Sequence, residues 1–164
     1  MKQGDVVVMD VGAEYQGYAA DITRTIPVSG KFTKAQKEVY SIALQAQREV
    51  IQMIRPGLPY RELDKKTRDI ITVAGYGKYI RHGVSHGLGI DVHDMSGLDT
   101  LRPGMVITIE PGIYIPTNAE DVKPEYRGFG IRIEDDVLVT ETGYELLSKV
   151  IPKEIRDIEK LMKK

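Results

Sequence analysis

Five residues with metal-binding side chains are spread along the sequence, each inside a short motif. They are Asp10 in VVVMDVG, Asp21 in GYAADITRT, His86 in HGVSHGLGIDVHD, Glu110 in TIEPG and Glu134 in GIRIEDD. Four carboxylates and one imidazole form the donor set expected for two adjacent divalent cations. Two such ions about 3.5 Å apart share a water and lower its pKa, so the sequence predicts a centre that generates a hydroxide nucleophile.

Asp10 and Asp21 lie in the two strands of a predicted hairpin. The strands are expected at 6–11, which should be buried, and at 18–27. A turn centred on Tyr15-Gln16 makes the two aspartates direct cross-strand partners, because their numbers are symmetric about it. Like charges opposed on one face of a sheet are destabilising, and a cation between them would reverse that effect. The alternative is a shifted turn or a bulge that points the two carboxylates apart.

All three histidines of the chain, His82, His86 and His93, fall close together among glycines. Glycine disfavours helix, so the segment is expected to fold as a loop and strand rather than as the helical zinc motif H-E-x-x-H. Neutral imidazole is a good ligand for Mn, Co or Zn. His86 is the predicted ligand, while His82 and His93 are expected in the site without binding metal. The alternative is that one or two of the three are ordinary hydrogen-bonded histidines.

Two glutamates complete the predicted centre. Glu110 closes a strand expected at 105–110 and is followed by Pro-Gly. Glu134 lies in a strand expected at 128–140, on the same face as Arg132. A carboxylate on an otherwise hydrophobic strand needs a partner if it is buried. A plain ion pair with Arg132 is the alternative to metal binding, but the other four motifs favour metal binding.

The elements that position these residues combine strands and helices. Thr33 is a predicted helix cap, Gln36 completes a capping box, and the helix stops at 55–57. Helical spacing predicts further helices at about 59–74 and at 153–164. Strands, two helices and more strands predict an α+β fold for residues 1–164.

Composition narrows the class of protein. The chain has 164 residues, which suits one domain, and its net charge of -1 without a basic tract predicts no nucleic-acid partner. The sequence contains no cysteine, signal peptide or apolar run that could span a bilayer. These features favour a cytoplasmic protein without a membrane partner. The chain opens almost at once on an apolar strand, which predicts that part of the domain precedes it.

Taken in order, the five motifs resemble those of the pita-bread metallopeptidases, which include methionine aminopeptidase, prolidase and aminopeptidase P. The resemblance runs from Val6 to Tyr144 and is closest to the bacterial aminopeptidases P, in GYAADITRT, HGVSHGLGIDVHD and EYRGFGIRIEDD. It implies a curved antiparallel sheet covered by helices, incomplete at its N-terminal side, as the C-terminal portion of a catalytic domain. It also implies release of the N-terminal residue from peptides with proline in second position, and a homo-oligomer.

The resemblance implies a role for each predicted metal ligand. Asp10 would bind one metal ion. Asp21 and Glu134 would bridge both ions, and His86 and Glu110 would complete the other. Manganese is the expected metal, with cobalt, zinc and iron as alternatives.

The resemblance also implies which residues take part in catalysis. Glu110 is the expected carrier of the proton from water to the leaving nitrogen. His93 would contact the substrate and the tetrahedral intermediate, and His82 would line the pocket that receives proline. Arg132 would order the site, with Tyr114 nearby as support.

Other functions stay open at this point. A prolidase would act on Xaa-Pro dipeptides rather than on longer peptides. A non-catalytic pita-bread binding module or a metal-free hydrolase of the creatinase type would be expected to lose ligands, and here all five are present. The predicted absence of the front of the domain keeps the binding module open.

Overall fold

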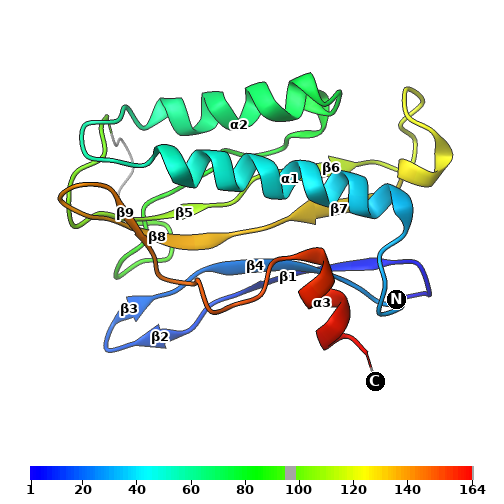
Figure 1. The fold of residues 1–164 in the computed structure, drawn as a ribbon, viewed down its shortest axis with the longest axis horizontal. Coiled ribbons are helices and arrows are strands. Elements are labelled where there is room, and N and C mark those ends of the chain that lie inside the picture. The colour runs from blue at the N-terminus through cyan, green and yellow to red at the C-terminus, as the bar shows by residue number, and fades with distance from the viewer. Residues whose placement is uncertain (95–98, 164) are drawn as a thin grey trace.

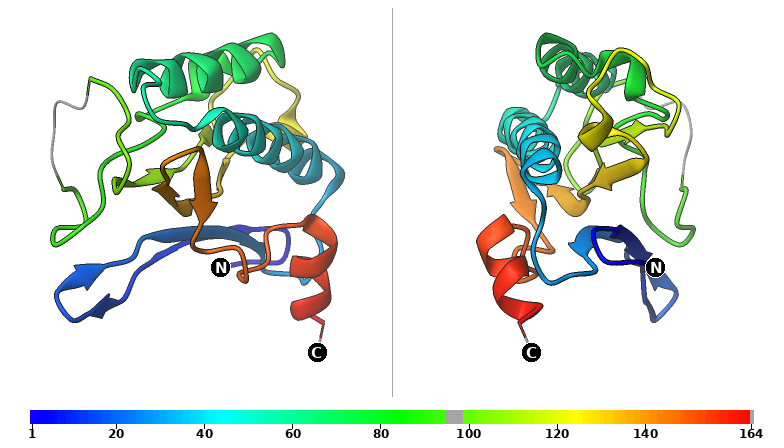
Figure 2. Two further views of the ribbon diagram at one scale, coloured as in Figure 1. Left: turned by 60° about the vertical axis from the view of Figure 1, so that its left-hand side comes forward. Right: turned by 90° about the vertical axis from the view of Figure 1, so that its right-hand side faces the viewer.

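Two helices lie side by side over a layer of antiparallel strands, and a long hairpin lies on the opposite side of that layer (Figure 1, Figure 2). The computed structural model describes residues 1–94 and 99–163. The strands are β1 Val6–Val11, β2 Glu14–Tyr15, β3 Tyr18–Ala19, β4 Ile22–Pro27, β5 Val106–Ile109, β6 Gly112–Ile115, β7 Phe129–Arg132, β8 Asp135–Val139 and β9 Tyr144–Leu146. The helices are α1 Lys34–Met53, α2 Arg61–Val73 and α3 Ile155–Leu161, with short 3₁₀ turns at Gly77–Tyr79 and Pro124–Tyr126.

The pairs between named strands are antiparallel. β1 pairs with β4, β2 with β3 and β6 with β7, while β8 lies between β5 and β9. β5 continues into β6, and β7 continues into β8, after breaks of two residues that contain Glu110 and Glu134 respectively. Two of the predicted ligands therefore lie where a long two-stranded ribbon is interrupted. The arrangement confirms the predicted α+β class.

Helix α1 begins at the predicted cap. The Thr33 side chain accepts a hydrogen bond from the Gln36 backbone at 3.2 Å, and the Gln36 side chain accepts one from the Thr33 backbone at 2.9 Å. This reciprocal pair satisfies two of the backbone N–H groups that a helix start leaves open. The capping box predicted from sequence is therefore present.

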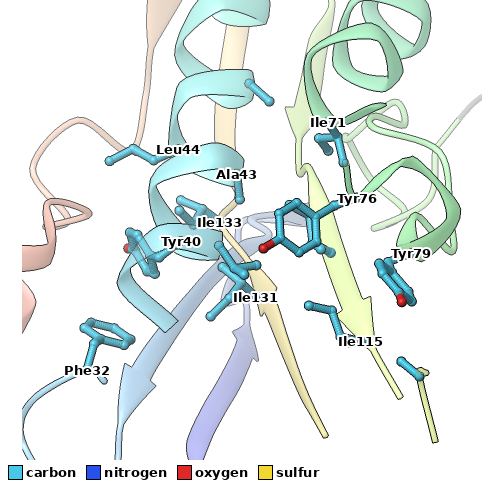
Figure 3. Close-up of a cluster of buried hydrophobic side chains, with 14 of the residues drawn as sticks. Phe32, Tyr40, Ala43, Leu44, Ile71, Tyr76, Tyr79, Ile115, Ile131 and Ile133 are labelled. Atoms are coloured by element: carbon cyan, nitrogen blue, oxygen red, sulfur yellow. The ribbon is translucent and has the colours of Figure 1, made fainter. Parts of the chain in front are cut away.

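The underside of α1 packs on the strands that carry the ligands. Figure 3 shows Tyr40 and Ala43 of α1 beside Ile131 and Ile133, which flank the end of β7. All four side chains are fully buried. Apolar area removed from water is the main stabilising contribution here. The helix thus fixes the position of the chain just before Glu134.

Several predicted strands differ from those observed. The strand expected at 18–27 is divided into β3 and β4, and the strand expected at 128–140 into β7 and β8. Alternating sequence marks extended chain but does not reveal where pairing stops. β1 has the predicted bounds but is not buried, since Met9 is 39% and Val11 60% exposed. Among the named strands only β4 pairs with β1, which leaves its outer side open.

The helices are predicted more closely than the strands. α2 and α3 lie inside their predicted ranges, and residue 164 lies outside the described residues. Ala74, just after α2, is exposed, and Leu161, the last residue of α3, is 70% exposed. Both come at helix ends, where the chain leaves the packed surface. In the described part of the chain, no helix combines the length and apolarity needed to cross a membrane.

Candidate metal centre

The hairpin that carries Asp10 and Asp21 turns at Gln16 and Gly17, one residue later than predicted. Both turn residues have positive φ, 52° and 81°, the geometry of a tight two-residue hairpin turn that glycine favours at its second position. The pairing therefore shifts by two residues, and Asp10 lies opposite Thr23. The predicted direct pairing with Asp21 is wrong.

Asp10 and Asp21 meet nevertheless, because a shift of two residues keeps a side chain on the same face of a hairpin. Burial and the neighbouring Asp10 carboxyl group raise the pKa of Asp21. The two chain segments also approach closely, since a Cβ on Gly12 would lie 1.9 Å from the carbonyl oxygen of Ala20. Glycine at position 12 thus allows the hairpin to narrow where the carboxylates converge.

His86 is placed by an extended segment that pairs with β5. The Thr108 backbone donates to the His86 carbonyl at 3.0 Å, and the Glu110 backbone donates to the Val84 carbonyl at 2.8 Å. The Thr108 hydroxyl also accepts from the His86 backbone at 3.1 Å. As a result, the His86 Nε2 lies 3.4 Å from a Glu110 carboxylate oxygen and 3.5 Å from an Asp21 carboxylate oxygen.

Glu134 is held by β4. Its backbone donates to the Thr23 carbonyl at 3.0 Å, and the Thr23 hydroxyl donates to its carboxylate at 2.5 Å. The Arg132 Nε donates to the same hydroxyl oxygen at 3.0 Å, which leaves the hydroxyl hydrogen for Glu134. Only 2% of Glu134 is exposed, so this carboxylate is fixed inside the protein.

The predicted ligands converge on one place. Ligand atoms of Asp21, His86 and Glu134 all lie within 4.8 Å of one another. Asp10 adjoins this group through Asp21, and Glu110 adjoins it through His86. The five motifs, far apart in the sequence, therefore bring their side chains together.

The carboxylates of this group repel one another. Burial, and then the carboxylates of Glu110, Asp21 and Asp10, raise the pKa of Glu134 to about 8, against the lowering effect of Thr23. Burial also raises the pKa of Glu110, although nearby imidazoles and Arg132 lower it. A cation at this point would favour the charged form of every carboxylate in the group. The donor set and its electrostatics therefore fit divalent metal ions.

Asp136 is a buried carboxylate at the edge of the group. Its Oδ2 accepts from the Asp21 backbone at 3.2 Å, and its Oδ1 is buried without a hydrogen-bond partner in the described residues. Burial raises the pKa of Asp136 to about 6, and nearby Asp21 and Asp135 add to the shift. Asp136 thus orients the backbone of one predicted ligand.

His82, Tyr114 and Arg132 form a line of hydrogen bonds along one side of the group. The Arg132 Nη1 donates to the Tyr114 hydroxyl at 2.9 Å, and that hydroxyl contacts His82 Nε2 at 2.7 Å. The Gly83 carbonyl, 2.8 Å from Nδ1, can only accept, so the neutral His82 ring carries its hydrogen on Nδ1. Its Nε2 therefore accepts from the Tyr114 hydroxyl. Tyr114 thus joins Arg132 to His82.

Arg132 forms an ion pair with Asp10 rather than with Glu134. Its Nε and Nη1 donate to Thr23 and Tyr114. The alternative interpretation of Glu134 as the partner of Arg132 is therefore wrong in this geometry. Glu134 is left with a neutral hydroxyl donor among crowded carboxylates.

His93 lies at the rim of the group. Its ring stacks on His86, with centroids 4.0 Å apart and planes at 25°. A hollow of about 530 Å³ adjoins it, lined in part by Asp10, Asp21 and Val92. Two of the predicted ligands, Asp10 and Asp21, and His93 therefore line one open space.

The sequence motifs do not single out three residues that hold the ligands, Thr23, Thr108 and Asp136. Each lies two residues from a ligand and so on the same face of an extended chain. That spacing was the available signal. It could not distinguish a supporting side chain from an ordinary sheet residue.

Comparison with known proteins agrees with this geometry. Residues 1–141 match the model of metallopeptidase family M24. The chain is 44% identical over 185 residues to the Xaa-Pro aminopeptidase of Escherichia coli K12, covering 99% of this chain and 42% of that protein. It is 46% identical over 154 residues to the Xaa-Pro dipeptidase of Pyrococcus horikoshii, covering 91% of this chain and 41% of that protein.

A solved structure is also similar. The zinc-substituted aminopeptidase P of Escherichia coli in complex with product superposes with a TM-score of 0.91 at 43% identity, over 99% of this chain and 42% of that one. The pita-bread fold expected from sequence is thereby confirmed. The chain spans about two-fifths of the length of the relatives it matches.

Proposed function

This chain belongs to metallopeptidase family M24, and we propose that it carries the metal centre of a proline-directed exopeptidase. The observation that carries the proposal is the convergence of ligand atoms from Asp21, His86 and Glu134 within 4.8 Å. Crowded carboxylates with raised pKa values around them support it. In this proposal, residues 1–164 form the C-terminal part of the catalytic domain, in the cytoplasm and in a homo-oligomer.

The proposed centre holds two divalent ions. Asp10 would bind one ion and His86 with Glu110 the other, while Asp21 and Glu134 would bridge them. The chemistry that such ions supply is a lowered pKa for water and stabilisation of negative charge on a substrate carbonyl. Manganese is our proposed metal, and cobalt, zinc and iron suit the same donors.

The chain's own residues would move protons and orient the peptide. Glu110 lies beside His86, and its raised pKa suits a group that accepts a proton from water and returns it to the leaving nitrogen. His93, which lines the hollow, would donate to the substrate carbonyl. His82 would line the proline pocket, and Arg132 would order the site through Asp10, Thr23 and Tyr114.

The proposed substrate is a peptide with proline in second position, cleaved after its first residue. A dipeptidase acting on Xaa-Pro is the second candidate. The alignment with the Escherichia coli aminopeptidase runs over 185 positions, more than the 164 residues of this chain, so that enzyme has insertions within the aligned region. The alignment with the Pyrococcus dipeptidase runs over 154 positions and needs fewer insertions. This smaller difference in length is the reason for keeping the dipeptidase as the second candidate.

Titration of the metal-stripped chain with Mn²⁺ in a calorimeter tests the centre. We expect two ions per chain, whereas binding of none would overturn the proposal. Hydrolysis of an Xaa-Pro tripeptide and an Xaa-Pro dipeptide, with matched Xaa-Ala peptides as controls, then separates the two activities. Cleavage of the dipeptide alone would identify the second candidate.

A further inference from the structure

Gln47 is a fully buried polar side chain on α1, located behind the two ribbon breaks. Its Nε2 donates to the backbone carbonyls of Ile109 and Ile133, at 3.3 Å in both cases. These residues directly precede Glu110 and Glu134. A single carboxamide therefore touches both chain segments that present a proposed glutamate ligand.

Both carbonyls lie at the strand breaks. The β5–β8 ladder ends with Ile109 opposite Asp135, and the β6–β7 ladder starts again with Gly112 opposite Arg132. Ile133 lies in the break between β7 and β8, outside both ladders, and a buried carbonyl left alone is costly. Ile109 is the last residue of β5, directly before the other break. A carboxamide carries two N–H donors, which match the two carbonyls. Gln47 thus bonds one carbonyl inside a break and one at the edge of the other.

The orientation of the carboxamide follows from its other contact. The Lys153 Nζ lies 2.9 Å from the Gln47 Oε1. Lysine has only donors, so the oxygen of Gln47 must face it and the NH₂ group must face the breaks. Lys153 also binds the Asp135 carboxylate at 2.5 Å. The position of the amide is therefore set by a buried charged pair.

Glu134 is held from a second point. The Arg24 Nη1 donates to the Glu134 carbonyl at 2.5 Å, next to the Ile133 carbonyl that Gln47 holds. Arg24 in turn binds Asp135 at 2.6 Å. Both successive carbonyls of this break are therefore fixed by buried side chains.

We propose that Gln47 is a positioning residue for the metal centre, whose carboxamide joins the two strand breaks and sets the separation of Glu110 and Glu134. The inference rests on the proposed function for its consequence, metal affinity, but its structural part concerns the chain without metal. A side chain that only filled space at this position would not need two donors.

Hydrogen exchange of the metal-stripped chain tests the structural part. The variant Gln47→Met fills the space without donors, and Gln47→Glu keeps the acceptor for Lys153 but not both donors. We expect the backbone amides of Glu110 and Glu134 to exchange at least tenfold faster in both variants. The matched control is Val50→Ala, a fully buried change three residues further along the same helix that removes no hydrogen-bond donor. It lowers overall stability and should leave the ratio of these two amides to other core amides unchanged.

Mn²⁺ titration of the same variants tests the consequence. We expect the dissociation constant of the weaker ion to rise about tenfold or more in Gln47→Met and Gln47→Glu, as for other residues that orient ligands, and to stay within twofold in Val50→Ala. Wild-type exchange in both Gln47 variants, or equal loss of Mn²⁺ affinity in Val50→Ala, would overturn the inference. If the wild-type chain bound no Mn²⁺, the proposed function would fail and the exchange experiment would decide the role of Gln47 alone.

Discussion

Two neighbouring carboxylates, Glu134 and Asp135, are both buried but have opposite electrostatic surroundings. Asp135 is fully buried and accepts from Arg24 at 2.6 Å, Lys153 at 2.5 Å and Ser148 at 2.6 Å. Glu134 accepts from the neutral hydroxyl of Thr23 and lies among other carboxylates. Successive residues of an extended chain point to opposite sides, so one ribbon carries both surroundings.

The difference indicates that Asp135 stabilises the fold, whereas Glu134 belongs to the proposed metal site. The chain supplies two cations for Asp135, and removing one partner of a buried ion pair strongly destabilises a protein because the other charge is left uncompensated. On the other side, Arg132 is directed to Asp10, and burial together with the carboxylates of Glu110, Asp21 and Asp10 raises the pKa of Glu134 to about 8. A carboxylate left in this state is in need of a cation from outside the chain, which is the property expected of a metal ligand.

The largest expected effect is the loss of stability on replacing Asp135, the carboxylate with two cationic partners. Asp135→Asn leaves Arg24 and Lys153 buried with incomplete compensation, and we expect the free energy of unfolding to fall by about 3–5 kcal/mol. Urea unfolding followed by circular dichroism measures it. The control is Asp157→Asn, a partly exposed carboxylate of α3, and it should stay within about 0.5 kcal/mol. An unchanged midpoint for Asp135→Asn would remove the contrast between the two residues.

The second effect is the loss of metal binding on replacing Glu134, the carboxylate without a cationic partner among the described residues. Glu134→Ala removes a proposed bridge between the ions, and we expect Mn²⁺ stoichiometry to fall from two to at most one, while the metal-stripped chain loses less stability than Asp135→Asn does. Calorimetric titration gives the stoichiometry. The exposed Glu120→Ala is the control and should bind like the wild type. Two ions bound by Glu134→Ala would show that this residue is not a bridge.

A smaller effect is expected for the hydroxyl that orients Glu134. Thr23→Val keeps the shape of the side chain but removes the bonds to Glu134 and Arg132, and we expect Mn²⁺ affinity to fall about 10–100-fold. The matched control is Thr67→Val, whose buried hydroxyl bonds the Leu63 carbonyl of α2 instead. Equal Mn²⁺ affinities in the two variants would mean that Thr23 has only a packing role.

The last prediction concerns pH. The pKa of Glu134 is raised from its ordinary 4.5 to about 8 in the folded chain, so between these values the folded state binds a proton that the unfolded state has lost. The free energy of unfolding of the metal-stripped chain must therefore fall as pH rises through this window. We expect a lower melting temperature at pH 8 than at pH 5, by about 2–4 °C for each kcal/mol lost. Glu134→Gln should flatten the dependence, and an equally steep fall in that variant would assign it to other groups.

Local features of the fold were readable in the sequence. The Thr33 capping box depends on contacts between residues three positions apart, and it forms as predicted. The hairpin was harder, because a turn centred one residue later moves every cross-strand partner by two. Asp10 and Asp21 stayed on one face only because an even shift preserves the alternation of side chains. The break at Glu110 has a signal in the Pro-Gly that follows it. The break at Glu134 has no clear signal, since the interrupted strand keeps its alternating pattern.

The sequence by itself determined the donor types, their order and the α+β class, because these depend on residue chemistry and on periodicity along the chain. Only the tertiary structure decided that Asp21, His86 and Glu134 meet, that Arg132 turns to Asp10, and that Gln47 spans both breaks. These outcomes depend on contacts between segments far apart in the chain. The distribution of buried charge between the two sides of one ribbon likewise follows from packing, which no local pattern contains.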